Sequence, residues 1–237
     1  MTCPAFPVII RVYNKPDAMQ PARRIYRRES EETRRSALIA ATQDLVAEGG
    51  PEAATVRAIA ERAGVTPGLI RHYFQSKDEL SRAAYRALMD GMTAKGSDAI
   101  EGVGAGPEER LAAFIAASLR PPVLDAGAVV LWAGYMHKVR SDPELMAVHE
   151  ASYLAYRDAL QRLIETLPRV IRSGQSRTEA IACNALIDGL WVEGSLLPAA
   201  FAPGEVITIG LGSVGAILGV DLLAHAAMLA YFGKTLS

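Results

Sequence analysis

Hydrophobic residues in the first third of the chain recur at spacings of three and four, between short turns. Over residues 31–48 they mark one face of a helix, which the glycines and proline at 49–51 end. Thr55 is a good N-cap for a short second helix, and Gly64 is placed to end that helix with a left-handed turn. The pattern predicts two helices of unequal length joined by a tight connection.

A third and a fourth helix are predicted directly afterwards. Residues 67–74 are amphipathic and begin with a proline, which the first turn of a helix tolerates because its backbone N–H has no helical partner there. Ser76 and Glu79 have the spacing of a capping box, and the helix that they begin reaches about Ala99. The N-terminal region is therefore predicted to be entirely helical.

Helical patterns also fill most of the remaining chain, with breaks rich in glycine and proline at 102–107 and 121–122. No segment alternates between apolar and polar residues with a period of two, so no strand is predicted. The fold class that follows is all-α, with an N-terminal three-helix helix-turn-helix domain before a larger helical domain. The further predicted helices lie at 111–119, 126–140, 143–166 and 178–197.

An apolar segment near the C-terminus imitates a dinucleotide site. Residues 206–215 look like its strand and glycine fingerprint, but a real site needs a second strand with an acidic residue about twenty positions later. Only residues 234–237 lie at that distance, so we predict no cofactor. The small residues Gly212, Gly215 and Ala216 instead favour a helix that packs closely against another helix.

The same region is apolar enough to raise the question of a membrane helix. Glu205, Asp221 and His225 divide residues 206–232, which leaves no uninterrupted stretch of the roughly twenty apolar residues that a spanning helix needs. We therefore predict no membrane contact and expect this segment to be a buried interface.

Charge adds an asymmetry to this picture. The chain of 237 residues has a formal net charge of -1, yet basic residues crowd its first segment, at Arg11, Lys15, Arg23, Arg24, Arg27, Arg28, Arg34 and Arg35. We predict a flexible basic arm over residues 1–29, which fits a DNA minor groove and a solvated tail equally well. No signal-peptide pattern is present, and Cys3 and Cys183 are too few for a disulfide framework or a zinc site. These observations indicate a cytoplasmic protein without a metal.

Residues 55–74 have the architecture of a helix-turn-helix. Ala60 is small enough for two helices to approach closely, and Gly64 provides the turn between them. Apolar residues stand where the second helix must pack back, at Val65, Ile70 and Phe74. The outward positions are Thr66, Pro67, Gly68, Arg71, His72 and Tyr73. This arrangement suits a helix that enters the major groove of DNA, and the alternative is a solvated hairpin whose arginines serve solubility.

The block resembles the signature of TetR-family repressors over about residues 34–80. The matching residues are Ala60, Gly64, Val65, Gly68, Tyr73, Phe74, Lys77 and Leu80. The resemblance implies that Arg57, Arg71 and His72 face base edges. It also implies that phosphates are held by Thr55, Thr66, Tyr73 and Lys77, with Pro67 and Gly68 at the leading end of the recognition helix.

Two stretches of the larger domain, 132–139 and 185–191, resemble the BetI-like subgroup of that family, whose best-known members respond to choline-pathway compounds. The resemblance implies a pocket in which aromatic rings surround a quaternary ammonium group, with Asp188 or Glu193 supplying charge. Core packing is the alternative role for these aromatic residues. The candidate ligand-binding residues are Trp132, Tyr135, Met136, His137, Asp188 and Trp191.

The resemblance further implies a homodimer. The helix at 178–197 and the small-residue helix beyond 205 would form a four-helix interface, whose candidate residues are Leu186, Leu190, Gly212, Gly215 and Ala216. Two-fold symmetry implies a palindromic operator in double-stranded DNA, and a small-molecule effector would release the dimer from it. The domains expected are a helix-turn-helix at 30–79 and an effector-binding and dimerisation domain at 80–237. The alternatives are an architectural DNA binder without sequence preference and a helical enzyme, for which no catalytic residues are recognisable.

Overall fold

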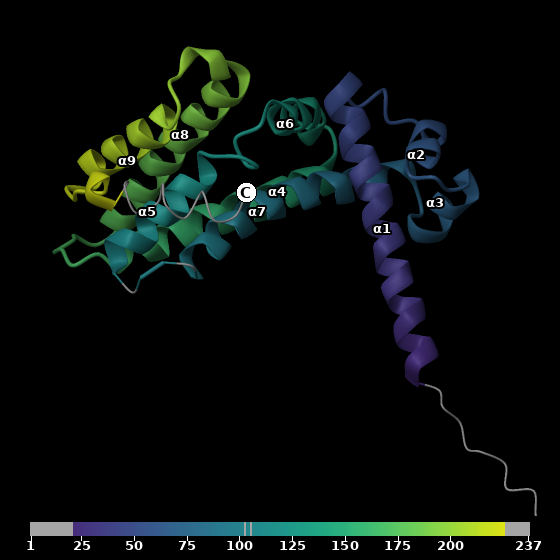
Figure 1. The fold of residues 1–237 in the computed structure, drawn as a ribbon, viewed down its shortest axis with the longest axis horizontal. Helices are drawn as coiled ribbons and strands as arrows, with labels where there is room; N and C mark the ends of the chain where they lie inside the picture. Colours follow the sequence, from purple (N-terminus) through teal and green to yellow (C-terminus); the bar gives the residue numbers. More distant parts are fainter. Residues whose placement is uncertain (1–20, 102, 105, 226–237) are drawn as a thin grey trace, which may run out of the picture. The chain divides into compact units, whose positions relative to one another are not determined.

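The computed structural model describes residues 21–101, 103–104 and 106–225, and the secondary structure of this part is entirely helical (Figure 1). The predicted all-α class is confirmed. The α-helices are α1 (Pro21–Gly49), α2 (Val56–Arg62), α3 (Pro67–Tyr73), α4 (Lys77–Glu101), α5 (Pro107–Ser118), α6 (Ala126–Val139), α7 (Pro143–Glu165), α8 (Gln175–Leu196) and α9 (Glu205–Leu218). Short 3-10 turns lie at Pro198–Ala200 and Leu223–His225.

Helix α1 begins at Pro21, ten residues before its predicted start at 31. Residues 21–29, predicted as part of a flexible arm, are therefore helical, whereas residues 1–20 of that arm lie outside the described part. The reason is local, since no glycine or proline interrupts the chain between Pro21 and Gly49, and a proline fits the first helical turn. Residues 21–36 belong to a unit separate from residues 37–225, and the side chains at 31–36 are exposed.

Side-chain caps set the helix boundaries around α2 and α4 as the sequence predicts. The Thr55 hydroxyl accepts a hydrogen bond from the Ala58 amide at 3.1 Å, and Gly64 has a φ of +65° in the turn before α3. The Ser76 hydroxyl accepts from the Glu79 amide at 3.1 Å, while the Glu79 carboxylate accepts from the Gln75 amide at 2.7 Å. The chain thus turns from α3 into α4 without a flexible linker.

One buried cluster, which we call the head core, joins α2 and α3 to the C-terminal part of α1 and to parts of α4, α6 and α7. Ile70 and Phe74 are 2 % and 1 % exposed in it, and Val65 packs on it while half-buried. Its large members include Leu38, Leu45, Ile59, Ile70, Phe74, Leu80, Tyr85, Met89, Leu131, Tyr135 and Leu145. Because α4 and α6 contribute to this core, the helix-turn-helix is packed directly on the helices that follow it.

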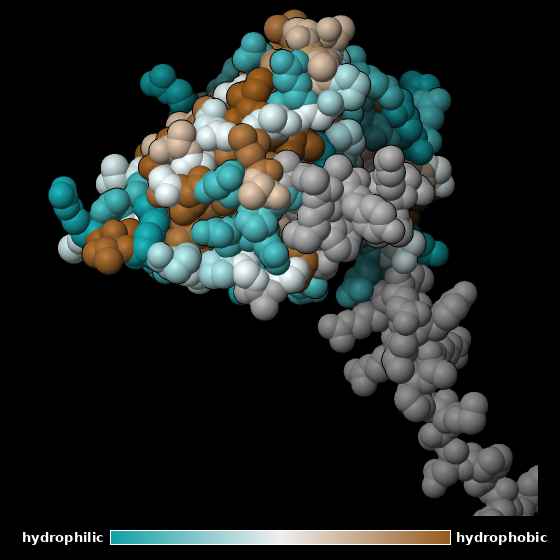
Figure 2. Space-filling view, turned by 60° about the vertical axis from the view of Figure 1, so that its left-hand side comes forward, coloured by the Kyte–Doolittle hydropathy of each residue, from teal (hydrophilic) through white to brown (hydrophobic). Residues whose placement is uncertain are grey.

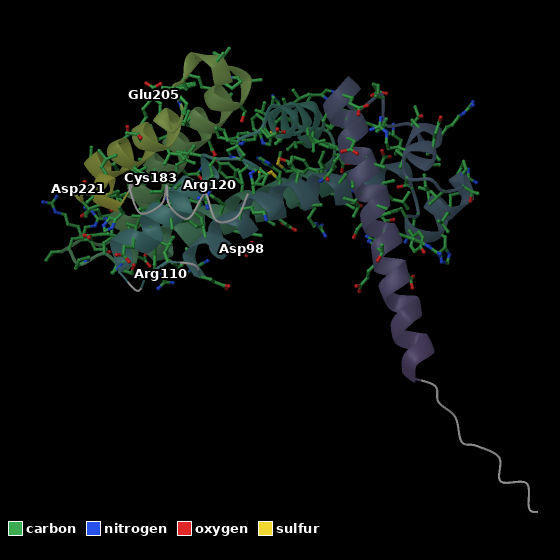
Figure 3. The ribbon with its side chains drawn as sticks, in the orientation of Figure 1. Asp98, Arg110, Arg120, Cys183, Glu205 and Asp221 are labelled. Atoms are coloured by element: carbon green, nitrogen blue, oxygen red, sulfur yellow. The ribbon has the colours of Figure 1, made fainter. Side chains whose placement is uncertain are left out.

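A second cluster, the body core, surrounds α5 among α4, α7, α8 and α9 (Figure 1). Every residue from Leu111 to Leu119 is buried, which fits a helix whose sequence is apolar on all sides. Cys183, labelled on α8 in Figure 3, belongs to this core, and burial raises the pKa of its thiol to about 12. Cys183 therefore serves as a small apolar core residue and not as a reactive thiolate.

The close approach of α4 and α5 depends on Gly96. A Cβ atom added to Gly96 would lie 2.6 Å from the fully buried ring of Phe114, whereas one added to Gly91 in the same helix meets nothing within 4 Å. We expect Gly91→Ala to raise the free energy of unfolding by about 0.5–1 kcal/mol, since alanine favours helix. Gly96→Ala adds a methyl group to a filled core, so we expect its free energy of unfolding to be about 1–3 kcal/mol lower than that of Gly91→Ala. Denaturation followed by circular dichroism measures both, and equal midpoints would contradict this packing.

Helix α9 corrects part of the interface prediction. Residues 206–209 lie at the start of α9, as the predicted helix requires. Gly215, however, packs inside the chain, where an added Cβ would lie 2.6 Å from the backbone oxygen of Val220. Leu190 on α8 is 9 % exposed in the body core. Gly215 and Leu190 were predicted at a dimer interface, but both serve the core of their own chain and have little surface left for a partner. Within the described residues, no helix has the length and hydropathy needed to cross a membrane.

Candidate nucleic-acid interface and ligand cavity

The outward face of α2 and α3 presents two arginines and a histidine. Arg57, Arg71 and His72 are exposed, and neither arginine has a hydrogen bond or ion pair with another described residue. Arg62 on α2 differs, because it donates two hydrogen bonds to the Glu48 carboxylate, at 2.9 and 2.7 Å. Arg62 therefore ties α2 to α1, whereas Arg57 and Arg71 have guanidinium groups that can still bind a base edge or a phosphate.

The remaining predicted contact residues surround these arginines. Thr55 uses its hydroxyl oxygen as the acceptor of the α2 cap, which leaves the hydroxyl hydrogen able to donate to a phosphate. Tyr73 is half-buried, with its ring edge-on to His72 at 5.0 Å between ring centroids, and Lys77 is half-buried at the start of α4. Thr66, Pro67 and Gly68 are exposed at the leading end of α3. All nine residues named for DNA contact thus lie at the surface of α2, α3 and the start of α4.

A cavity of about 320 Å³ lies within the body, bounded by residues of α4, α5, α6, α7 and α8. Apolar side chains, including Met89 and Met92 of α4, form much of its wall. Its aromatic and polar lining residues include Trp132, His149, Tyr153, Tyr156, Asn184, Asp188 and Trp191. Among the lining residues described, Asp188 is the only acid, and there is no lysine or arginine.

The Asp188 carboxylate is the polar centre of the cavity. Tyr153 donates a hydrogen bond to its Oδ2 at 2.6 Å, and the Asn184 amide donates to the same oxygen at 2.9 Å. Burial raises the pKa of Asp188, although these two hydrogen bonds and the neighbouring His149 act in the opposite direction. Burial also lowers the pKa of His149, a change that the charge of Asp188 opposes. The carboxylate is therefore partly desolvated and is paired with neutral donors only.

Two tryptophans stand at right angles on the aromatic side of the cavity. The ring centroids of Trp132 and Trp191 are 5.9 Å apart with an interplanar angle of 90°. Trp191 is held by a hydrogen bond from its indole N–H to the backbone oxygen of Val123 at 2.7 Å. Tyr156 shares a hydrogen bond of 2.8 Å with Ser118. Fixed aromatic faces near one carboxylate are the surroundings that a small organic cation prefers.

The structure brings together three of the six ligand-binding residues predicted from the sequence, namely Trp132, Asp188 and Trp191. Tyr135 is 1 % exposed in the head core, Met136 packs against that core, and His137 is exposed. The prediction that Tyr135, Met136 and His137 line the cavity is wrong, because α6 lies between two cores and only its first part reaches the cavity.

The candidate residues predicted from the sequence include none from α7. The sequence suggests that His149 could polarise a ligand, but a lone histidine on an amphipathic helix is usually solvated, and Tyr153 and Tyr156 were missed. His149, Tyr153 and Tyr156 follow the spacing of one helical face, which is the signal that could have identified them together. Asn184 stands one turn before Asp188 on α8 and was missed as well. Nothing in the sequence says that the faces of α7 and α8 meet. No group of His, Cys, Asp and Glu residues in the described part could hold a metal ion.

Comparison with known proteins agrees with this geometry. Residues 38–84 match the family model described as bacterial regulatory proteins of the tetR family, and residues 107–219 match the model described as BetI-type transcriptional repressor, C-terminal. The HTH-type transcriptional regulator BetI of Serratia proteamaculans is 30% identical over 177 residues, which cover 74% of this chain and 88% of that protein. The BetI of Stenotrophomonas maltophilia is 31% identical over 175 residues, covering 72% and 86%.

Solved structures share the fold. A transcriptional regulator from Pseudomonas aeruginosa PAO1 superposes with a TM-score of 0.71 at 31% identity, covering 82% of this chain and 94% of that one. A regulator from Saccharomonospora viridis in complex with choline gives a TM-score of 0.63 at 18% identity, covering 79% and 96%, and this likeness is one of fold alone. The head, the helical body and these relatives together lead to one conclusion. This chain belongs to the TetR family of transcriptional regulators and carries a BetI-type C-terminal domain.

Proposed function

We propose that this regulator is a dimeric repressor that binds a palindromic operator and is released from it by a small organic cation of the choline type. The observation that carries the choice of effector is the pairing of Asp188 with aromatic walls in one cavity. The choline complex of the S. viridis regulator supports the same class of ligand, as does the resemblance to the BetI-like subgroup, whose best-known members respond to choline-pathway compounds.

A cation suits the cavity for two physical reasons. The Asp188 carboxylate accepts hydrogen bonds from Tyr153 and Asn184, but neither donor neutralises its charge. A trimethylammonium group would supply that charge, and its methyl groups would contact the faces of Trp132 and Trp191. Each cation–π contact is worth about 0.5–2 kcal/mol, more when the site excludes water.

The proposed dimer uses the outer face of α8 and α9. Ile181 and Leu196 on α8 are 38% and 53% exposed, and Ile209 and Ile217 on α9 are 37% and 40% exposed. Figure 2, with the α8–α9 end brought forward, shows hydrophobic patches at the surface between polar ones. An apolar surface of this kind is typical of a protein interface.

On α9, the small residues Gly212 and Ala216 would let a helix of a partner approach this face closely, and Leu186 of α8 would add an apolar contact. Ala216 is exposed on α9, Gly212 is half-buried against Leu223, and Leu186 is half-buried on α8. These three are retained as interface residues from the sequence prediction. A two-fold pair would place two α3 helices in successive major grooves about 34–36 Å apart, which requires a palindromic site.

The proposed test begins with an operator that the protein itself selects from a pool of random duplexes. Sedimentation should give a dimer, and the selected site should be palindromic. Choline is then titrated into the labelled complex, with 3,3-dimethyl-1-butanol as the matched control because it has the same shape without the charge. We expect choline to weaken operator binding and the alcohol to have little effect. Equal effects of both compounds, or no effect of choline at saturation, would overturn the choice of a cationic effector.

A further inference from the structure

Polar side chains join helix α4 to α7 and to its N-cap residue at three positions along α4. Arg82 of α4 forms ion pairs with Asp142, the N-cap residue, at 3.2 Å and with Glu144 at 2.8 Å, and Ser152 of α7 donates to Asp90 at 3.2 Å. Between them, the Tyr85 hydroxyl and Nδ1 of His149 are 2.8 Å apart. Of the three α4 residues, only Tyr85 is fully buried. Its partner His149 lines the ligand cavity, as Ser152 does, but Asp90, the partner of Ser152, is exposed and does not belong to the head core.

Tyr85 has a second set of contacts on the side of the head. Its ring lies 5.1 Å from that of Tyr135, centroid to centroid, and both are 0–1 % exposed members of the head core, which also holds Ile70 and Phe74 of α3. We infer that Tyr85 is the positioning residue through which occupation of the cavity reaches the DNA-binding helices, acting by its hydrogen bond to His149. This inference rests on the proposed function, because it needs an effector in that cavity.

The chemistry of the pair fixes the direction of the hydrogen bond. Burial raises the pKa of the Tyr85 phenol, so the hydroxyl keeps its proton, and burial lowers the pKa of His149, which favours the neutral ring. A buried hydroxyl needs an acceptor, and Nδ1 of His149 is the partner that the described residues offer to Tyr85. The arrangement that satisfies both groups has Tyr85 donating to Nδ1 and the imidazole proton on Nε2, and the proposed coupling uses this arrangement.

An effector changes the surroundings of His149 directly. The ring of His149 lies 5.6 Å from that of Tyr153, centroid to centroid, and Tyr153 donates to Asp188. A cation beside Asp188 competes for this carboxylate and contacts the same wall, so it favours one position of the His149 ring over another. Tyr85 stands eight residues after the start of α4 at Lys77, about 12 Å along the helix. A shift of Tyr85 therefore acts on α4 close to the recognition helix.

The experiment measures the coupling between two ligands. Operator affinity is determined with and without saturating choline, and the ratio of the two dissociation constants is the coupling factor, which is typically about 5- to 150-fold in such systems. Tyr85→Phe removes one oxygen and leaves the ring in place. We expect the coupling factor to fall several-fold toward one, while operator affinity without choline changes less than about twofold. Only a loss of communication lowers the ratio while operator affinity is retained.

Tyr156→Phe is the matched control. It removes a cavity hydroxyl whose hydrogen bond to Ser118 is also 2.8 Å long, but this bond leads to α5 and away from the head core. Its effect should fall on choline affinity and leave the coupling factor as in the wild type. Trp132 and Trp191, the two tryptophans of the chain, both line the cavity, so their emission reports choline binding and an intact pocket in each variant.

The outcomes separate this inference from the proposed function. If the wild type shows no coupling with choline, the proposed function fails. If the wild type is coupled and Tyr85→Phe is coupled equally, or if Tyr156→Phe loses as much coupling, the role of Tyr85 is overturned. The double variant Tyr85→Phe, His149→Gln provides a further check. If both residues act through the one hydrogen bond between them, the coupling factor of the double variant should be no lower than that of the single variants.

Discussion

Arg71→Ala is expected to lower the ratio of operator affinity to random-duplex affinity by about 5- to 150-fold for each half-site. Arg71 is exposed on α3 and has no hydrogen bond or ion pair with another described residue, so its guanidinium group can form the paired hydrogen bonds that recognise guanine. Such a contact gives about 1–3 kcal/mol of discrimination against the wrong base. Fluorescence anisotropy with the selected operator and with a random duplex, at one fixed salt concentration, measures the ratio.

Two control variants distinguish base recognition from general electrostatics. Arg62→Ala removes an arginine of α2 that is paired with Glu48, and it should leave the affinity ratio unchanged. Lys77→Ala, at the start of α4, should weaken binding to both duplexes alike and reduce the salt dependence by about one phosphate contact per protomer. If Arg71→Ala lost affinity for both duplexes equally, the residue would hold phosphate and the protein would read its site in another way.

Asp188→Asn is expected to weaken choline binding by about 2–4 kcal/mol, which corresponds to roughly 30- to 1000-fold in affinity. The substitution keeps the shape of the side chain and its place beside Tyr153 and Asn184, but removes the only negative charge among the described lining residues. Tryptophan fluorescence measures choline binding, and 3,3-dimethyl-1-butanol serves as the uncharged control. The affinity for 3,3-dimethyl-1-butanol should change little, because Asp188→Asn removes a charge and leaves the packing of the cavity as it was.

The same carboxylate predicts how choline binding depends on pH. A cation binds the ionised form of Asp188, so affinity is greatest above the pKa of this group and falls as the pH drops through it. Because burial raises that pKa above the ordinary value of 3.8, the loss should begin at a higher pH than for an exposed aspartate. Protonation of His149 also lowers choline affinity as the pH drops, because it places a positive charge in the cavity lining. Asp188→Asn should therefore show a flatter pH profile, and an unchanged profile would contradict the role of Asp188.

The helix-turn-helix was predictable from the sequence because the features that define it lie close together along the chain. The cap at Thr55, the positive φ of Gly64 and the capping box at Ser76 each depend on hydrogen bonds or backbone angles within a few residues. The same local signals set the ends of the later helices to within a few residues. The all-helical class followed from the absence of any alternating pattern. The early start of α1 was missed because the segment after Pro21 is mostly charged and lacks a sustained repeat of apolar residues at helical spacing.

Which helical faces meet was decided only by the tertiary structure. Helical periodicity marks Trp132 and Tyr135 as inward-facing alike, but α6 lies between two cores, so Trp132 lines the cavity while Tyr135 supports the head. From the sequence, Gly215 is a candidate interface residue, but in the structure the backbone at Val220 fills the space beside its Cα atom. The contact of Tyr85 with His149 joins residues 64 positions apart. Local sequence specifies each helix because its hydrogen bonds are short in range, whereas cavities and couplings arise from side chains on helices that only packing brings together.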